Sequence, residues 1–124
     1  MLELAKQNVP SATLELADIV TWTTIQSFDG IIAWDSLFHL PPQDQVPVLE
    51  KLFNALKPNG AALVTFGGRA GEIRSTMLGR EFYYGSLATD QYTDALNRIG
   101  FETILMSRDK TADGRIALLL KKAA

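Results

Sequence analysis

The sequence has 124 residues, of which 47% are hydrophobic, and this length and composition are typical of one compact α/β domain spanning residues 1–124. A net charge of −2 and a pI near 5.3 argue against a non-specific nucleic-acid surface, and the absence of cysteine excludes disulfides, thiolate metal sites and cysteine nucleophiles. There is no apolar stretch of membrane-spanning length and no signal-peptide pattern, so we expect a cytoplasmic protein without membrane or nucleic-acid partners.

Hydrophobic periodicity predicts strands alternating with helices. In chain order we expect a helix at 1–8, strands at 12–17 and 29–34, a helix at 44–57, a strand at 61–66, irregular structure at 67–86, a helix at 90–98, and strands at 101–106 and 115–121. This alternation indicates a mainly parallel sheet. The last two strands are joined too closely for a crossover, so they should pair antiparallel.

The strand at 29–34 leads into a cluster of polar residues. Ile31 to Trp34 form a short apolar run, typical of a parallel strand covered on both faces. Asp35, Ser36 and His39 follow where the strand ends. Ligands of open α/β sheets bind at this carboxyl edge, so the sequence predicts a ligand site here.

The helix after this cluster is predicted to be amphipathic. Its apolar residues recur at intervals of three and four, and these are Val46, Leu49, Leu52, Phe53 and Leu56. The opposite side is predicted to face solvent and carries Glu50, Lys51 and Asn54. If the helix begins near Asp44, Pro47 lies in its first turn, and Pro58-Asn59-Gly60 should end it.

These motifs, in this order, resemble the central part of class I S-adenosylmethionine-dependent methyltransferases of the small-molecule kind. The resemblance rests on the strand before Asp35-x-x-x-His39, the amphipathic helix, and the turn from Leu56 to Gly60 before the strand at 61–66. Residues 14–17 resemble the third strand of that family, and 99–102 resemble the entry to its sixth. The resemblance implies a Rossmann-like fold with a C-terminal antiparallel hairpin, whose last strand inserts between its neighbours.

The same resemblance implies S-adenosylmethionine as cofactor and a small molecule as methyl acceptor. It makes Asp18 the acceptor for the adenine amino group, with Ile19 packing on the adenine ring. Trp34 and Asp35 would line the cofactor pocket, and Asp35 would also reach the reacting groups. The alternatives are a turn or cap role for Asp18 and a core or pocket-wall role for Trp34.

His39 is the only histidine, and it lies four residues beyond Asp35. An imidazole titrates near neutrality, so His39 could take a proton from the acceptor during methyl transfer. The alternative is a structural histidine that bonds the following turn. One histidine with scattered carboxylates does not give the spacing of a metal site, so no metal is expected.

One departure from the family lies at the N-terminus. Upstream of residue 10 there is neither a glycine-rich cofactor loop nor a strand ending in the acidic residue for the ribose, and the helix at 1–8 has no capping residue before it. This suggests an N-terminally truncated chain that lacks the first two strands, although a fraying terminal helix would look alike. We therefore expect poor binding of S-adenosylmethionine and an inactive isolated chain.

The missing strands would leave sheet edges without partners. The family's strand order is 3-2-1-4-5-7-6, and without its first two strands the sheet could shorten to 3-4-5-7-6. The competing solution is that a second copy of the chain covers the exposed edge of the fourth strand, and we expect such a homodimer. An alternative function is a non-catalytic, methyltransferase-like module that associates through this open edge. A different Rossmann-like enzyme, such as an oxidoreductase, is disfavoured because no G-x-G-x-x-G motif exists.

Two further segments are interpreted from composition. Gly67 to Gly71 should form a flexible pocket rim, and residues 74–84, rich in arginine and aromatic side chains, occupy the region of the family's substrate cover. An aromatic or anionic acceptor is one interpretation of that region, and a solvated arginine face is the other. Lys121 and Lys122 are expected to form a solvated tail.

Overall fold

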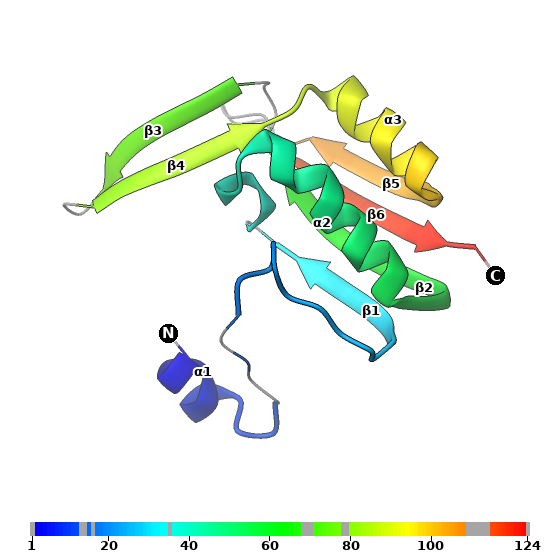
Figure 1. Cartoon of the computed structure of the whole chain (residues 1–124), viewed down its shortest axis with the longest axis horizontal. Helices are drawn as coiled ribbons and strands as arrows, with labels where there is room; N and C mark the ends of the chain where they lie inside the picture. Colours follow the sequence, from blue (N-terminus) through cyan, green and yellow to red (C-terminus); the bar gives the residue numbers. More distant parts are fainter. Residues whose placement is uncertain are drawn as a thin grey trace.

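The computed structural model describes residues 2–12, 15, 17–34, 36–67, 71–77, 80–108 and 115–123. Their elements, shown in Figure 1, are α1 (Leu2–Asn8), β1 (Phe28–Ala33), the 3-10 helix η1 (Leu37–His39), α2 (Pro42–Ala55), β2 (Leu56–Phe66), β3 (Gly71–Met77), β4 (Arg80–Ser86), α3 (Thr89–Ile99), β5 (Phe101–Arg108) and β6 (Ile116–Lys122).

Four of the strands form the main sheet in the order β1-β2-β6-β5. β1 is parallel to β2, and β6 is antiparallel to both of its neighbours. The last strand of the sequence thus lies inside the sheet, as predicted, and the order matches strands 4-5-7-6 of the methyltransferase fold. The strand predicted at 12–17 is not found in the described residues 12, 15 and 17, and residues 13, 14 and 16 lie outside the described part.

Both α2 and α3 cover the same face of the sheet (Figure 1). Their apolar residues and the inward-facing side chains of β2 and β6 form the core. Its members include Val48, Leu49, Leu52, Val64, Phe66, Tyr92, Leu96, Leu118 and Leu120. Phe101 at the start of β5 extends this core, and its ring meets Phe53 of α2 edge-on with 5.0 Å between centroids.

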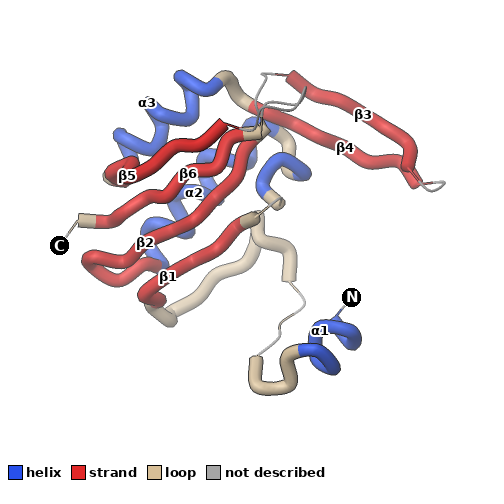
Figure 2. Tube along the Cα trace, turned by 180° about the vertical axis from the view of Figure 1, so that it is seen from behind, coloured by secondary structure: helices blue, strands red, loops and turns tan. Residues whose placement is uncertain are grey.

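The opposite face of the sheet has no described helix over it, as Figure 2 shows from behind. One row of directly paired residues crosses all four strands on this side: Ile32, Leu63, Leu119 and Leu105. Ile32 is 74% exposed and Leu105 is 62% exposed. The expectation that the strand at 29–34 is covered on both faces is therefore wrong for the described residues, because both helices of the core pack on one side.

α2 begins at Pro42, two residues earlier than predicted, and ends at Ala55. Pro42 is suited to the first helical position because its missing N–H would have no partner there. Pro47 consequently lies beyond the first turn, inside the helix, and not at its start as predicted. There it withholds the N–H that would otherwise bond the carbonyl of Gln43.

The C-terminus of α2 is capped by a lysine from β6. Lys122 donates through Nζ to the carbonyls of Phe53 at 2.9 Å and Leu56 at 3.0 Å, so it is not the solvated tail that we expected. The cation also offsets the negative end of the helix dipole. Asn59, which was predicted to help end the helix, has a left-handed backbone with φ of 68°, but it lies in β2 and not at the helix end.

The segment predicted as irregular, 67–86, contains the antiparallel hairpin of β3 and β4, whose pairing runs from Gly71–Ser86 to Met77–Arg80. The irregular interpretation is therefore wrong for β3 and β4, since β-branched and aromatic residues favour strands. Residues 68–70, in the middle of the predicted pocket rim, lie outside the described residues. In Figure 1 the hairpin projects away from the main sheet.

Candidate functional site

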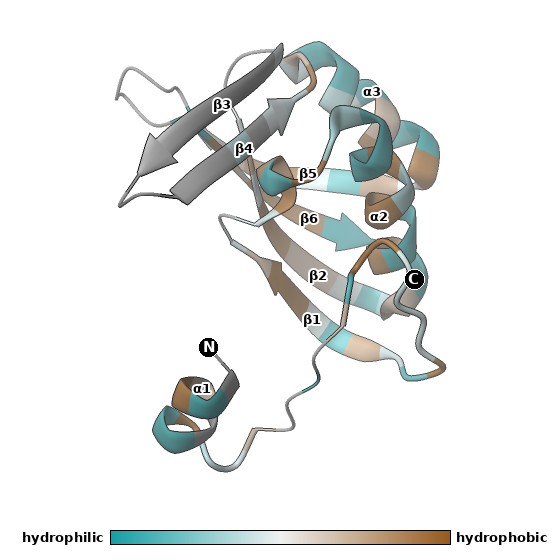
Figure 3. Cartoon of the chain, turned by 60° about the vertical axis from the view of Figure 1, so that its left-hand side comes forward, coloured by the Kyte–Doolittle hydropathy of each residue, from teal (hydrophilic) through white to brown (hydrophobic). Residues whose placement is uncertain are grey.

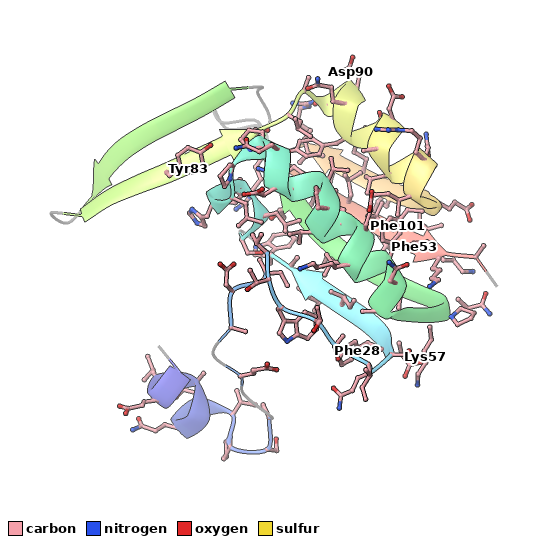
Figure 4. All side chains as sticks on the ribbon, viewed as in Figure 1. Phe28, Phe53, Lys57, Tyr83, Asp90 and Phe101 are labelled. Atoms are coloured by element: carbon pink, nitrogen blue, oxygen red, sulfur yellow. The ribbon has the colours of Figure 1, made fainter. Side chains whose placement is uncertain are left out.

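The carboxyl end of β1 leads into η1, which the core holds in place through buried Leu37. The exposed His39 follows, and its Nδ1 lies 3.2 Å from the carbonyl oxygen of Tyr83 on β4. Its ring also contacts the ring of Phe38, with 4.7 Å between centroids. Figure 4 labels Tyr83 where β4 passes this end of the sheet. The predicted catalytic histidine therefore joins the β1 exit to the β3–β4 hairpin.

A buried polar cluster holds the base of that hairpin. Gln45 of α2 is fully buried and donates through Nε2 to the carbonyls of Leu40 at 2.9 Å and Gly85 at 2.8 Å. Tyr92 of α3 donates its hydroxyl to Gln45 Oε1 and accepts from the Leu87 N–H at 3.0 Å. Burial raises the pKa of the Tyr92 hydroxyl, because ionisation would place a charge in this enclosed site.

Asp18 lies in a tight turn, as one of the predicted interpretations has it. The Val20 N–H donates to Asp18 Oδ1 at 3.0 Å, and the N–H groups of Thr21 and Trp22 donate to the Asp18 carbonyl. Within the described residues, no hydrogen bond uses the second carboxylate oxygen of Asp18 or the N–H of Ile19. The turn thus presents a carboxylate oxygen of Asp18 as an acceptor next to the Ile19 N–H as a donor.

Lys51 ties this turn to α2. Its Nζ donates to the carbonyls of Ile19 at 3.2 Å and Trp22 at 3.0 Å, and also to the carbonyl of Val20. Figure 3 shows the segment looping beside α2 before it returns to β1. The structure therefore corrects the solvent-facing assignment of Lys51, because its side chain is partly buried under the turn.

The predicted cofactor residues lie on both sides of the sheet. Ile19 packs against the core on the covered face. Trp34 is 47% exposed, and it follows Ile32 by two positions, which in an extended chain places both on the open face. Its ring has the Arg115 guanidinium 5.5 Å from its centroid. The structure does not bring Ile19 and Trp34 together, and Asp35 lies outside the described residues.

Two hollows are present on the described surface. One, of about 270 Å³, is lined by Glu15, Ala17, Ile19 and Trp22, so it adjoins the Asp18 turn. The other, of about 310 Å³, lies between α2 and α3, and none of the predicted site residues lines it. Among the described residues there is no grouping of side chains that could hold a metal ion, and no described helix has the length and apolarity needed to cross a bilayer.

Sequence reasoning missed three residues that shape this site: Gln45, Lys51 and Tyr92. Gln45 and Lys51 are polar residues of an amphipathic helix, where periodicity alone assigns them to the solvent side. Their partners lie far away in sequence, at residues 85 and 92 for Gln45 and at 19–22 for Lys51. No local pattern could have found these pairings.

Residues 1–60 match the protein family described as a methyltransferase domain. No curated protein matches the chain at a significant level. Among solved structures, a putative S-adenosylmethionine-dependent methyltransferase from Listeria monocytogenes superposes with a TM-score of 0.82 at 13% identity, covering 100% of this chain and 76% of its own. An S-adenosylmethionine-dependent methyltransferase from Clostridium acetobutylicum gives 0.79 at 12% identity, with 99% and 71% covered.

The Burkholderia thailandensis 1,6-didemethyltoxoflavin-N1-methyltransferase, with bound 1,6-didemethyltoxoflavin and S-adenosylhomocysteine, gives a TM-score of 0.70 at 15% identity. It covers 99% of this chain but only 56% of its own length. The described strand order and these superpositions confirm the predicted Rossmann-like methyltransferase fold.

Proposed function

We propose that this chain, which has the fold of S-adenosylmethionine-dependent methyltransferases and matches their domain family over residues 1–60, serves methyl transfer to a small-molecule acceptor. The observation that carries the proposal is the Asp18 turn. The family resemblance implies adenine recognition by Asp18 and Ile19, and their turn offers a carboxylate oxygen as acceptor beside the Ile19 N–H as donor, which supports the proposal.

The turn fits an adenine ring chemically. The exocyclic amino group of adenine can donate a hydrogen bond to the Asp18 carboxylate, and the adjacent ring nitrogen can accept a hydrogen bond from the Ile19 N–H. Ile19 and Trp22 supply an apolar wall in the adjoining hollow. In contrast, the sequence before β1 contains no glycine, so this chain offers no glycine-rich loop for the rest of the cofactor.

For the reaction itself, S-adenosylmethionine supplies an activated methyl group that an acceptor nucleophile takes from the sulfonium sulfur. The protein chiefly has to position the acceptor and exclude water. We assign His39 the removal of the acceptor proton. With its proton on Nδ1, His39 donates to the Tyr83 carbonyl and uses Nε2 as the base. Asp35 is proposed to assist at the same site.

The first test is binding of S-adenosylmethionine to the 124-residue chain by titration calorimetry. We expect a dissociation constant well above the micromolar range, because the contacts of a glycine-rich loop and of a ribose carboxylate are not supplied. Micromolar or tighter binding would contradict this expectation and would require another segment to replace those contacts.

A second test separates the two residue roles. In a chain supplied with a glycine-rich cofactor loop, Asp18→Ala should weaken S-adenosylhomocysteine binding about tenfold, a loss of roughly 1.4 kcal/mol that is typical of a hydrogen bond to a charged group. His39→Ala should leave that binding unchanged and lower turnover. Equal, negligible effects of the two substitutions would remove both residues from the site.

The open side of β1 favours a second candidate function, that of a non-catalytic module that self-associates. Among the described residues no strand pairs with the outer edge of β1, and Ile32 on that strand is largely exposed. An unprotected strand edge can pair with a second copy, so we propose a homodimer. Light scattering should give a mass above 13.6 kDa, whereas a single 13.6 kDa species would exclude the homodimer.

A cytoplasmic location remains a prediction from the sequence.

A further inference from the structure

The Asp18 carboxylate, the Ile19 N–H and the adjoining hollow together form the proposed adenosine subsite. We infer that Lys51 is the positioning residue of this subsite: it fixes the Asp18 turn against α2, so that the carboxylate acceptor and the N–H donor of the turn face a ligand. This inference rests on the proposed function, since it assigns a support to the subsite named there. Lys51 touches the turn and not the ligand, so it acts through Asp18 and Ile19.

The hydrogen bonds of the turn are divided between two partners. The N–H groups of residues 20–22 are all taken up by Asp18, through its side chain or its carbonyl. The carbonyls of Ile19, Val20 and Trp22 all accept from the Lys51 ammonium. An ammonium has three N–H donors, so this arrangement uses its full capacity.

The consequence of this division is a defined orientation. With three carbonyls directed at Lys51, the turn is held against α2 by its carbonyl side. Of the N–H groups of residues 19–22, the one that has no hydrogen bond within the described residues is that of Ile19. Ile19 and Trp22 also line the adjoining hollow, so the residues held by Lys51 form its wall.

The position of Lys51 on α2 makes it a rigid support. Leu49 and Leu52, its neighbours on the helix, are buried in the core, so the backbone of Lys51 cannot shift without disturbing that packing. The described residues before β1 are not paired into the sheet. The turn therefore takes its place from α2, and Lys51 is the polar link between the two.

The test is a titration of the ¹⁵N-labelled 124-residue chain with adenosine, followed through the amide shifts of Ile19 and Val20. In the wild-type chain we expect saturable shifts at millimolar adenosine and little effect from inosine, which lacks the amino group. Lys51→Met should raise the adenosine dissociation constant about tenfold or more, a loss of about 1.4 kcal/mol. Lys51→Arg should restore most of the affinity, because a guanidinium can also donate to several carbonyls.

Lys57→Met is the matched control, since it removes an equal charge from an exposed position whose ion pair with Asp29 spans 3.7 Å. It should leave the shifts unchanged. Lys51→Gln, which keeps two N–H donors, provides a milder variant should Lys51→Met fail to fold. Its affinity should lie between those of the wild-type chain and Lys51→Met.

The outcomes separate the two proposals. If the wild-type chain binds adenosine at Ile19 and Lys51→Met or Lys51→Gln binds it equally well, Lys51 is not a positioning residue and the proposed subsite stands. If the wild-type chain shows no shifts at Ile19 and Val20, the subsite itself is wrong and the role of Lys51 falls with it.

Discussion

The two faces of the main sheet differ although the same strands supply both. On the covered face, Leu118 of β6 is buried beneath the helices. On the open face, its neighbour Leu119 is only partly buried, and it forms a row with Ile32, Leu63 and Leu105. Alternation along a strand sends successive side chains to opposite faces, so one leucine supports the fold and the next leaves apolar surface exposed.

This difference shows that an apolar strand alone does not determine its own burial. The run Ile116 to Leu120 is apolar at every position, which is typical of a strand buried on both faces. In the described structure the helices α2 and α3 bury one face only. The open row is therefore surface that suits a contact, and five predictions test whether the two faces differ in energy as they do in exposure.

The largest expected effect comes from truncating the covered leucine. Leu118→Ala should lower the free energy of unfolding by about 3 kcal/mol, because it leaves a cavity in a packed core. Leu119→Ala removes the same atoms from the open face and should cost less than about 1 kcal/mol. Urea unfolding of both variants measures the difference, and equal costs would show that the open face is buried in solution.

The next effect concerns Tyr92 on the covered side, whose ring stacks on the ring of Phe66 with 3.9 Å between centroids. Tyr92→Phe should cost about 2 kcal/mol at neutral pH, because Gln45 and the Leu87 N–H lose a buried partner. Urea unfolding at pH 7 checks this value. A cost below about 0.5 kcal/mol would mean that the buried cluster does not hold the hairpin base.

The pH dependence of the same variant follows from the raised pKa of Tyr92. The tyrosine of the unfolded chain ionises near pH 10, whereas the folded chain keeps Tyr92 neutral at that pH. The contribution of this hydroxyl to the free energy of unfolding is therefore complete below pH 10 and is lost as the pH rises through the raised pKa of the folded state. The wild-type chain should therefore lose more stability than Tyr92→Phe between pH 9 and about 11. Parallel pH profiles of the two proteins would contradict the burial of this hydroxyl.

A smaller effect separates the adjacent lysines of β6. Lys122→Met removes the cap from the last carbonyls of α2 and should cost about 1 kcal/mol, as losses of helix caps do. Lys121→Met changes an exposed side chain on the open side and should stay within about 0.5 kcal/mol of the wild type. Thermal unfolding of both variants provides the comparison, and the reverse ranking would overturn the capping role.

The smallest effect on folding should come from Ile32→Lys on the exposed part of β1. Its free energy of unfolding, measured at low protein concentration, should change by less than about 0.5 kcal/mol. Its mass by light scattering should nevertheless fall to 13.6 kDa, because a lysine blunts an edge strand and breaks the apolar row. Association that persists in this variant would place the contact elsewhere.

Elements with long periodic patterns could be predicted from the sequence, whereas contacts between distant segments could not. The predicted helix at 90–98 differs from α3 by one residue at each end, and the insertion of β6 followed from the family's strand order. The hairpin of β3 and β4 was missed because glycine and arginine in 67–86 suggested a loop. Asp18, Ile19 and His39 could be proposed as site residues from the family resemblance, whereas the role of Lys51 depends on a pairing across 29–32 residues that no local spacing reveals.

The central place of β6 also sets the order in which the chain can fold. Synthesis proceeds from the N-terminus, so β2 and β5 are made before the strand that joins them. Until residues 116–122 have left the ribosome, β2 has only β1 as a partner and β5 has none. The four-stranded sheet therefore cannot close until β6 has been made, and a stop codon at Ile116 would remove the strand with which both β2 and β5 pair.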